Sequence, residues 1–190
     1  MPNHPTRDDA IALLHEYTKS DSLRRHALGV EQAMVKMAEK YGGDLNEWGI
    51  VGLLHDFDYE MYPTMEEHPY KGNEILKEKG YPESICKAIM GHATYTGIPR
   101  DTDMAKALFS VDELTGFIFA VTYVRPSRSI FEVQPKSVKK KLKQKSFAAS
   151  VVREDIFLSV EELEIDMTEH IQFVIDALAE KAEILGLAGD

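Results

Sequence analysis

The sequence predicts an all-α protein, a single-domain helical bundle. Apolar residues recur three or four positions apart along most of the 190 residues, as they do on the buried face of a helix. Residues that favour helix ends separate these stretches, and no alternation of apolar and polar residues lasts long enough to form a sheet. The length suits one domain that buries its own hydrophobic core.

Each predicted helix has an identifiable start or end. Ser20 and Asp21 are capping residues before the second helix, and Gly42 ends it. Pro69 and Pro82 occupy positions that favour the start of the fourth and fifth helices. The predicted helices are 8–19, 21–41, 44–54, 69–79, 82–91, 103–124, 137–145 and 159–186.

Two of these starts have the spacing of a capping box. Asp44 stands three residues before Glu47 at the third helix, and Ser159 stands three residues before Glu162 at the last helix. The last predicted helix is long and carries an apolar stripe, which packs either on the core or on another subunit. A homo-oligomer is therefore one of the expectations.

Composition narrows the classes of function. A formal net charge of −10 argues against general nucleic-acid binding through a basic surface. No apolar run is long enough to span a bilayer, and there is no charged-then-apolar leader, so no membrane partner is expected. The single cysteine, Cys86, excludes an internal disulfide and favours a reducing compartment, the cytoplasm.

Imidazole and carboxylate side chains occur on five successive helical segments. In an all-helical domain the ligands of a metal ion must converge from several helices, because one helix presents only two or three side chains to one point. Imidazole nitrogen and carboxylate oxygen suit divalent first-row transition metals (Mn, Fe, Co, Ni or Zn), one or two ions being expected. The candidate ligands are His26, His55, Asp56, His68, His92 and Asp112.

Asp56 is the natural bridge between two ions, because its carboxylate has two oxygens and follows His55 directly at a helix end. Two ions a few ångströms apart activate a water and neutralise the charge that develops on a phosphoryl group. This arrangement favours a hydrolase that acts on a small phosphorylated molecule.

The segments that carry these residues resemble the HD superfamily of metal-dependent phosphohydrolases. They are "RRHALGVE", "GLLHDFDYE", "HPYKGNEIL", "IMGHATYTG" and "ALFSVDELTGFI". The resemblance is strongest to the HDIG-type branch, although His-Asp-Phe-Asp stands where that branch has His-Asp-Ile-Gly. It implies an HD-type core over about 20–125 and a basic, helical C-terminal extension over 126–190.

The resemblance also implies how the ligands divide. His26, His55, Asp56 and Asp112 would hold one ion, while Asp56, His68 and His92 would hold a second. The Gly-Tyr-Pro signature and adjacent histidines of the superfamily's cyclic dinucleotide phosphodiesterases are missing from "GHATYTGIP". Single-metal nucleotidases of the superfamily need only four of the ligands.

Three hypotheses remain open at this point. The first is a metal-dependent phosphohydrolase, a phosphomonoesterase or phosphodiesterase, that acts on a small substrate such as a nucleotide. The second is a di-iron oxygenase of the same fold with the same ligands. The third is a non-catalytic module that binds metal or nucleotide.

Further polar residues are candidates for catalysis and substrate binding. Asp56 and Asp58 are the catalytic candidates, Asp58 as a group that positions the water or accepts its proton. Lys71, Arg24 and Arg25 lie near candidate ligands in the sequence and are expected to meet a substrate phosphate.

A basic tract follows the longest apolar helix. Residues 125–145 carry eight basic side chains against one acidic side chain, Glu132. The tract is either a solvated helix face or a rim that recruits phosphate at the cleft. His4, His15 and His170 have no comparable context and are expected to be structural.

Overall fold

The computed structural model describes residues 5–189, and its regular structure is helical apart from one isolated β-bridge between Ser129 and Ala188. The all-α prediction is therefore confirmed. Two short 3-10 helices are η1 (Thr94–Thr96) and η2 (Ile130–Glu132). The α-helices are α1 (Arg7–Tyr17), α2 (Asp21–Tyr41), α3 (Leu45–Leu54), α4 (Tyr70–Glu78), α5 (Glu83–His92), α6 (Asp103–Tyr123), α7 (Pro135–Leu142), α8 (Arg153–Glu162), α9 (Met167–Ala179) and α10 (Ala182–Leu185).

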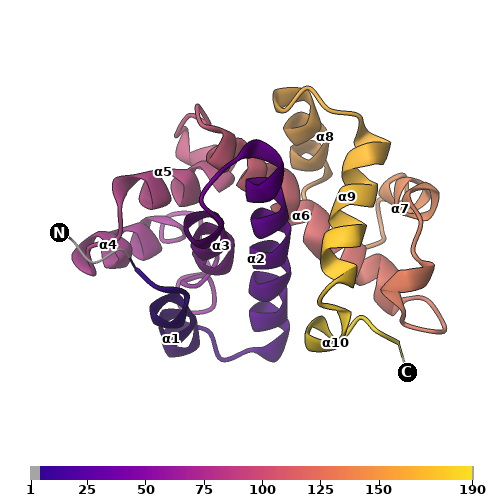
Figure 1. Cartoon of the computed structure of the whole chain (residues 1–190), viewed down its shortest axis with the longest axis horizontal. Helices are drawn as coiled ribbons and strands as arrows, with labels where there is room; N and C mark the ends of the chain where they lie inside the picture. The colour runs from indigo at the N-terminus through magenta and orange to yellow at the C-terminus, as the bar shows by residue number, and fades with distance from the viewer. Residues whose placement is uncertain (1–4, 190) are drawn as a thin grey trace.

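The two longest helices, α2 and α6, form the centre of the molecule. Helix α2 packs on α3, α6 and α9, and α6 also packs on α5 and α8. Figure 1 shows α1, α3, α4 and α5 on one side of α2, and α7, α9 and α10 on the other. The C-terminal helices thus complete the bundle around α2 and α6.

Helix α2 begins and ends where its capping residues predict. The Ser20 hydroxyl accepts a hydrogen bond from the backbone N–H of Leu23 at 3.5 Å. Gly42 has φ 72°, a left-handed conformation that glycine adopts without steric cost. Both ends follow from local chemistry that is visible in the sequence.

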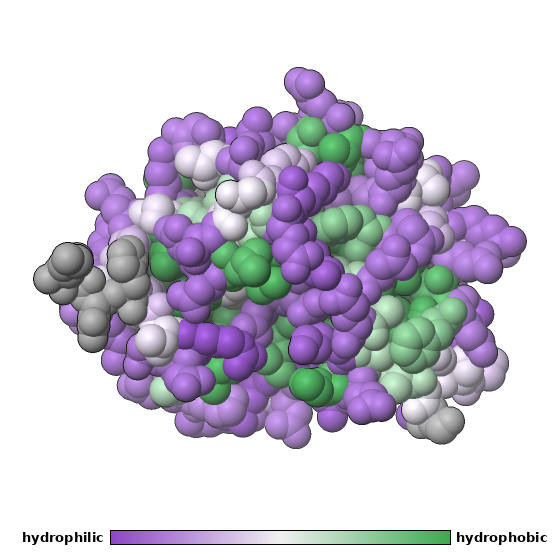
Figure 2. Space-filling model, in the orientation of Figure 1, coloured by the Kyte–Doolittle hydropathy of each residue, from purple (hydrophilic) through white to green (hydrophobic). Residues whose placement is uncertain are grey.

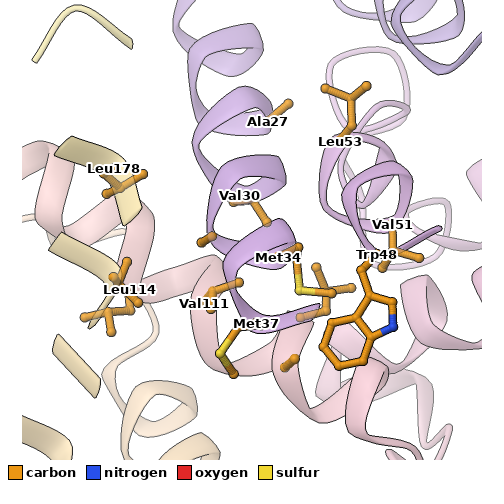
Figure 3. Close-up of a cluster of buried hydrophobic side chains, with 14 of the residues drawn as sticks. Ala27, Val30, Met34, Met37, Trp48, Val51, Leu53, Val111, Leu114 and Leu178 are labelled. Carbon is orange, nitrogen blue, oxygen red and sulfur yellow. The ribbon is translucent and has the colours of Figure 1, made fainter. Parts of the chain in front are cut away.

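The hydrophobic core is one cluster that includes side chains from α1 to α10. On the surface in Figure 2, hydrophilic side chains cover most of the visible face and apolar ones gather in small groups between them. Figure 3 shows part of the core, in which α2 faces α3 on one side and α6 and α9 on the other. Its labelled side chains are Ala27, Val30, Met34, Met37, Trp48, Val51, Leu53, Val111, Leu114 and Leu178.

Helices α2 and α3 touch through their backbones at Gly52. A Cβ atom on Gly52 would lie 2.8 Å from the carbonyl oxygen of Val30 and 2.9 Å from the backbone nitrogen of Glu31. The absence of a side chain lets the two helices approach this closely. The contact places His26 on α2 next to His55 at the end of α3.

The predicted capping box at α3 forms only in part. The Asp44 carboxylate accepts from the backbone N–H of Glu47 at 2.8 Å, as expected for a helix N-cap. The Glu47 carboxylate, however, accepts from the hydroxyl of Ser84 on α5. A tertiary contact has replaced the reciprocal local one.

The single long helix predicted for 159–186 is wrong. The segment contains the end of α8, all of α9 and α10, and Glu164 between α8 and α9 has a left-handed φ of 54°. Asp166 then caps α9 by accepting from two backbone N–H groups of its first turn. Ser159, the expected cap, lies inside α8 and donates its hydroxyl to the carbonyl of Ile156.

The apolar stripe of α9 faces the core. Its buried residues belong to the same cluster as those of α2 and α6, which resolves the two alternatives for this stripe in favour of packing within the chain. Within 5–189, no helix combines the length and the apolar character that crossing a membrane requires.

Candidate metal centre

The six candidate ligands meet at one end of α3. His26 lies in the second turn of α2, His55 ends α3, and Asp56 follows it in a turn. His68 precedes α4, His92 is the last residue of α5, and Asp112 lies in the middle of α6. Their ligand atoms form two groups that share Asp56, the first with His26, His55 and Asp112 and the second with His68 and His92.

The first group centres on Asp112. One of its oxygens, Oδ1, lies 3.0 Å from Nε2 of His26 and 3.2 Å from Nε2 of His55. The same His55 nitrogen lies 3.4 Å from Oδ2 of Asp56. Two imidazole nitrogens and two carboxylates therefore face a common point, as in a transition-metal site.

The second group uses the other oxygen of Asp56. Oδ1 lies 3.2 Å from Nε2 of His68 and 3.3 Å from Nε2 of His92, and these two nitrogens are 3.3 Å apart. The two oxygens of Asp56 thus face different histidine pairs. The carboxylate has the position of a bridge between two ions.

The hydrogen bonds of the imidazole rings orient their Nε2 atoms toward these groups. Nδ1 of His55 and of His92 each donates to the carbonyl three residues earlier, and Nδ1 of His68 donates to Asp58. A proton on Nδ1 leaves the Nε2 lone pair free for a metal. Nε2 of His55 is buried without a hydrogen-bond partner, and Nε2 of His68 faces Nε2 of His92 at 3.3 Å. Both observations fit a cation between these atoms.

The carboxylates of the site favour the binding of a positive charge, either a proton or a metal ion. Burial lowers the pKa of His55, but the carboxylates of Asp56 and Asp112 outweigh it and hold that pKa well above its usual value. Burial likewise opposes ionisation of Asp112, yet the neighbouring His55 and His26 keep its pKa below the usual range. In His68, the carboxylates of Asp56 and Asp58 overcome burial and raise the pKa to about 9.

The contacts of Asp58 do not support the catalytic role expected from the sequence, which stays a prediction. Its side chain is buried and absent from the cleft lining. Oδ1 accepts from Nδ1 of His68 at 2.8 Å, and Oδ2 accepts from the backbone N–H of Gly72 at 2.8 Å. Both oxygens are therefore used to orient His68 and to hold the start of α4.

A cleft of about 710 Å³ opens over both groups of ligands. The segment before α8 forms one wall, where the backbone N–H of Val152 donates to Glu113 at 3.2 Å. Thr94 on η1 donates its hydroxyl to Asp155 on α8 at 3.4 Å. Burial and the adjacent Asp112 carboxylate raise the pKa of Glu113 to about 8.

One arginine fixes the segment that connects α7 to α8. The guanidinium of Arg153 donates to backbone carbonyls throughout this segment, which ends at the cleft wall. The five carbonyls belong to Leu142, Gln144, Phe147, Ala148 and Val151.

The three basic residues predicted to bind substrate lie outside the lining of the cleft. Arg24 donates to the carbonyl of Thr18 at the end of α1, and Arg25 approaches Gly186. Lys71 is exposed and pairs with Glu74 at 2.9 Å. Their contribution to substrate binding stays a prediction without support from these contacts.

The basic tract also lies apart from the cleft. Four lysines of α7 and the residue after it line a separate surface depression with Thr168 of α9. The apolar side chains Val138 and Leu142 anchor the helix in the core. This arrangement favours the solvated helix face over the phosphate-recruiting rim. The four lysines are Lys136, Lys139, Lys140 and Lys143.

Among the described residues, His15 and His170 are absent from the cleft lining. His170 is buried and bonded to the carbonyl of Ser110 at 2.9 Å, and burial lowers its pKa. His15 is exposed near the end of α1, and His4 lies outside the described residues.

Four titratable residues of the cleft lining were not identified from the sequence. Tyr59 lies in the turn after α3, Tyr95 lies in η1, and Asp155 lies in a region where no metal ligand was expected. Glu113 follows a candidate ligand directly, and that adjacency was the only signal available for it.

Comparison with known proteins agrees with this geometry. Residues 23–116, just under half of the chain, match the family model of the HD domain. Residues 23–116 are therefore an HD domain, the domain of the HD superfamily of metal-dependent phosphohydrolases. The matched range contains all six candidate ligands of this HD-domain protein.

A curated relative is the symmetrical bis(5'-nucleosyl)-tetraphosphatase of Staphylococcus aureus. It is 29% identical to the HD-domain chain over 119 residues, which cover 55% of this chain and 59% of the relative. No solved structure gives a significant match.

Proposed function

We propose that this protein hydrolyses a phosphoryl bond of a small phosphorylated molecule, a nucleotide, at a dinuclear site. His26, His55, Asp56 and Asp112 hold one divalent ion, and Asp56, His68 and His92 hold the second. The single observation that carries this proposal is the division of Asp56 between two groups, with Oδ2 toward His55 and Oδ1 toward His68 and His92.

Bound ions supply an activated water and neutralise charge on the phosphoryl group. The chain supplies the rest. Three imidazoles arrive with their Nδ1 protons already donated to protein acceptors, so they need not reorganise when the site fills. The cleft above the ligands places a phosphoryl group against them and confines it between η1 and α8.

The nucleotide part of the proposal rests on the relative. A protein described as a bis(5'-nucleosyl)-tetraphosphatase shares 29% identity with part of this chain. The cleft volume lies within the range of roughly 300–1,000 Å³ that small-molecule sites occupy. A nucleotide is therefore consistent with the name of the relative and with the volume of the cleft.

The test combines metal analysis with phosphate release. Protein purified without chelators is expected to contain two ions per chain by elemental analysis, and to release phosphate from nucleotides when loaded with Mn²⁺, Co²⁺, Ni²⁺, Zn²⁺ or Fe²⁺. Asp101→Asn is a matched control, because this exposed carboxylate pairs with Lys87 far from the ligands.

Two results would overturn the proposal. Dioxygen uptake by the iron-loaded protein without phosphate release would identify an oxygenase. Nucleotide binding without turnover for every metal tested would identify a binding module.

A further inference from the structure

The cleft over the metal centre contains no lysine or arginine among the described residues that line it. Four carboxylates line it instead, those of Asp56, Asp112, Glu113 and Asp155. Sites for polyphosphate chains ordinarily place lysine or arginine beside each phosphate. This cleft provides no such cation for a phosphate apart from the metal ions that its ligands would hold.

Two arginines on segments next to the cleft walls are engaged by other groups. Arg100, which follows η1, pairs with Glu162 and donates to the carbonyl of Gly91. Arg153 is saturated by the backbone carbonyls before α8. Neither guanidinium is free to turn toward a phosphate without losing those bonds.

Aromatic and apolar side chains form the outer part of the cleft. The rings of Tyr59 and Tyr95 are 42% and 43% exposed, and Met65 and Val152 lie beside the same space. The hydroxyl of Tyr95 donates to the carbonyl of His68 at 2.7 Å, which fixes the ring next to the metal centre. The Tyr59 ring stands edge-on to His68, with ring centroids 5.4 Å apart.

A fixed, half-exposed aromatic ring is a surface on which a flat ring stacks. Such stacking is worth about tenfold or more in affinity for each base that it holds. Both tyrosines adjoin His68, so a ring stacked on either one would lie within a short linker of a phosphoryl group at the ligands. The cleft therefore has one end for a phosphoryl group and one end for a flat, uncharged body.

We propose that the substrate is a phosphomonoester with an aromatic body, of the nucleoside monophosphate kind, and that nucleotides with longer phosphate chains are poor substrates. This inference rests on the proposed function. The carboxylates of Asp56 and Asp112 belong to the ligand set and offset half of the formal charge of two divalent ions. The ions can then neutralise one phosphate of about −1.5 to −2 charge directly. Each additional phosphate would lie beside carboxylates alone. The expected preference differs from that stated in the name of the Staphylococcus aureus relative.

The experiment compares substrates on the Mn²⁺-loaded full chain. Hydrolysis of AMP, ADP, ATP, diadenosine tetraphosphate and ribose 5-phosphate is measured by chromatographic loss of substrate, because symmetrical cleavage of diadenosine tetraphosphate gives ADP and no inorganic phosphate. We expect kcat/KM for AMP to exceed that for each polyphosphate, and for ribose 5-phosphate, by about tenfold or more. Higher kcat/KM for ATP or diadenosine tetraphosphate would overturn the inference.

Calorimetric binding of the same compounds separates this inference from the proposed function. If AMP binds most tightly but is not hydrolysed, the proposed function fails while the inference on ligand class stands. If a polyphosphate binds most tightly, or AMP does not bind at all, the inference fails.

Variants of the cleft test each half of the inference. Tyr95→Leu is expected to raise KM for AMP about tenfold and to leave KM for ribose 5-phosphate unchanged, since only AMP has a ring to stack. Tyr95→Phe keeps the ring and is expected to retain most of the affinity, which guards against a folding defect. Tyr123→Leu is the control, because this ring is 41% exposed on α6 and does not line the cleft. Equal KM for AMP in Tyr95→Leu and Tyr123→Leu would overturn the stacking role.

A gain of charge tests the other half. Val152→Lys adds a cation at the rim, and we expect it to raise kcat/KM for ATP several-fold while changing that for AMP less. An unchanged ratio between ATP and AMP would contradict the electrostatic argument.

Discussion

Replacement of Asp58 by asparagine tests how the second group of ligands is held. The asparagine side chain has the same shape but offers one acceptor and one donor in place of two acceptors. If its oxygen faces His68, its NH₂ group meets the N–H of Gly72. If its oxygen accepts from Gly72, its NH₂ group faces Nδ1 of His68 and favours the tautomer whose proton lies on Nε2, the atom that faces Asp56.

Rotation of helix α4 cannot relieve this conflict. A Cβ on Gly72 would lie only 2.7 Å from Cγ of Asp58, so the helix already touches the carboxylate with its backbone. Loss of a partner that orients a ligating histidine costs about 10–100-fold in metal affinity. This corresponds to about 1.4–2.7 kcal/mol. The loss should fall on the second ion alone, because Nδ1 of His55 donates to a backbone carbonyl that the substitution does not touch.

Calorimetric titration of Mn²⁺ into chelator-treated protein is the assay. The unmodified protein is expected to show two binding events, and Asp58→Asn to weaken one of them by the stated factor. Asp101→Asn serves as the control for loss of a carboxylate. Two unchanged affinities in a folded Asp58→Asn variant, as judged by its melting temperature, would refute the positioning role.

Three other outcomes are expected. Asp56→Ala removes the shared carboxylate, so metal content by elemental analysis and phosphate release should both fall to background; full turnover would exclude the bridge. Gly52→Ala places a methyl against the backbone of α2 and should lower the free energy of unfolding in a urea titration by about 1–3 kcal/mol, whereas Gly49→Ala, whose Cβ would meet only side chains, should cost less. Because the pKa of His68 is raised to about 9 in the metal-free protein, its protonated form stabilises the fold fully below pH 6.5 and progressively less as the pH rises through 9. Burial of Glu113 acts in the same direction, so chelator-treated protein should melt at lower temperature as the pH rises from 6.5 to 9. The fall should be smaller in metal-loaded protein, in which an ion replaces the proton of His68.

The helices of the core could be predicted because their signals are local. Ser20 and Gly42 set the ends of α2 by chemistry that any reader of the sequence can see. The break between α8 and α9 could not be predicted in the same way. Leu163 and Met167 continue the apolar spacing across it, although Glu164 turns left-handed and Asp166 starts a new helix. Periodicity records which face is apolar, and it does not record whether the helix is continuous.

The same distinction between local signals and tertiary packing applies to the residues of the candidate site. The six candidate ligands could be predicted because each lies in a segment with a family context, and the structure brings all six together. Arg24 lies outside the cleft lining although it is close to His26 in the sequence, because two residues along a helix point to nearly opposite sides. Tyr95 and Asp155 reach the cleft only through the packing of η1 and α8, which no local pattern encodes.

Arg153 shows that a residue outside the cleft lining can determine the shape of the surface that faces the substrate. Its guanidinium gathers five carbonyls from a segment with almost no helical hydrogen bonds of its own, and thereby sets the path of the chain to the cleft wall. Lysine has the same charge but no planar fork of donors, so it could not hold that path. Arg153 does not line the cleft, yet it thus contributes to the specificity of the cleft through the path of the chain that forms its wall.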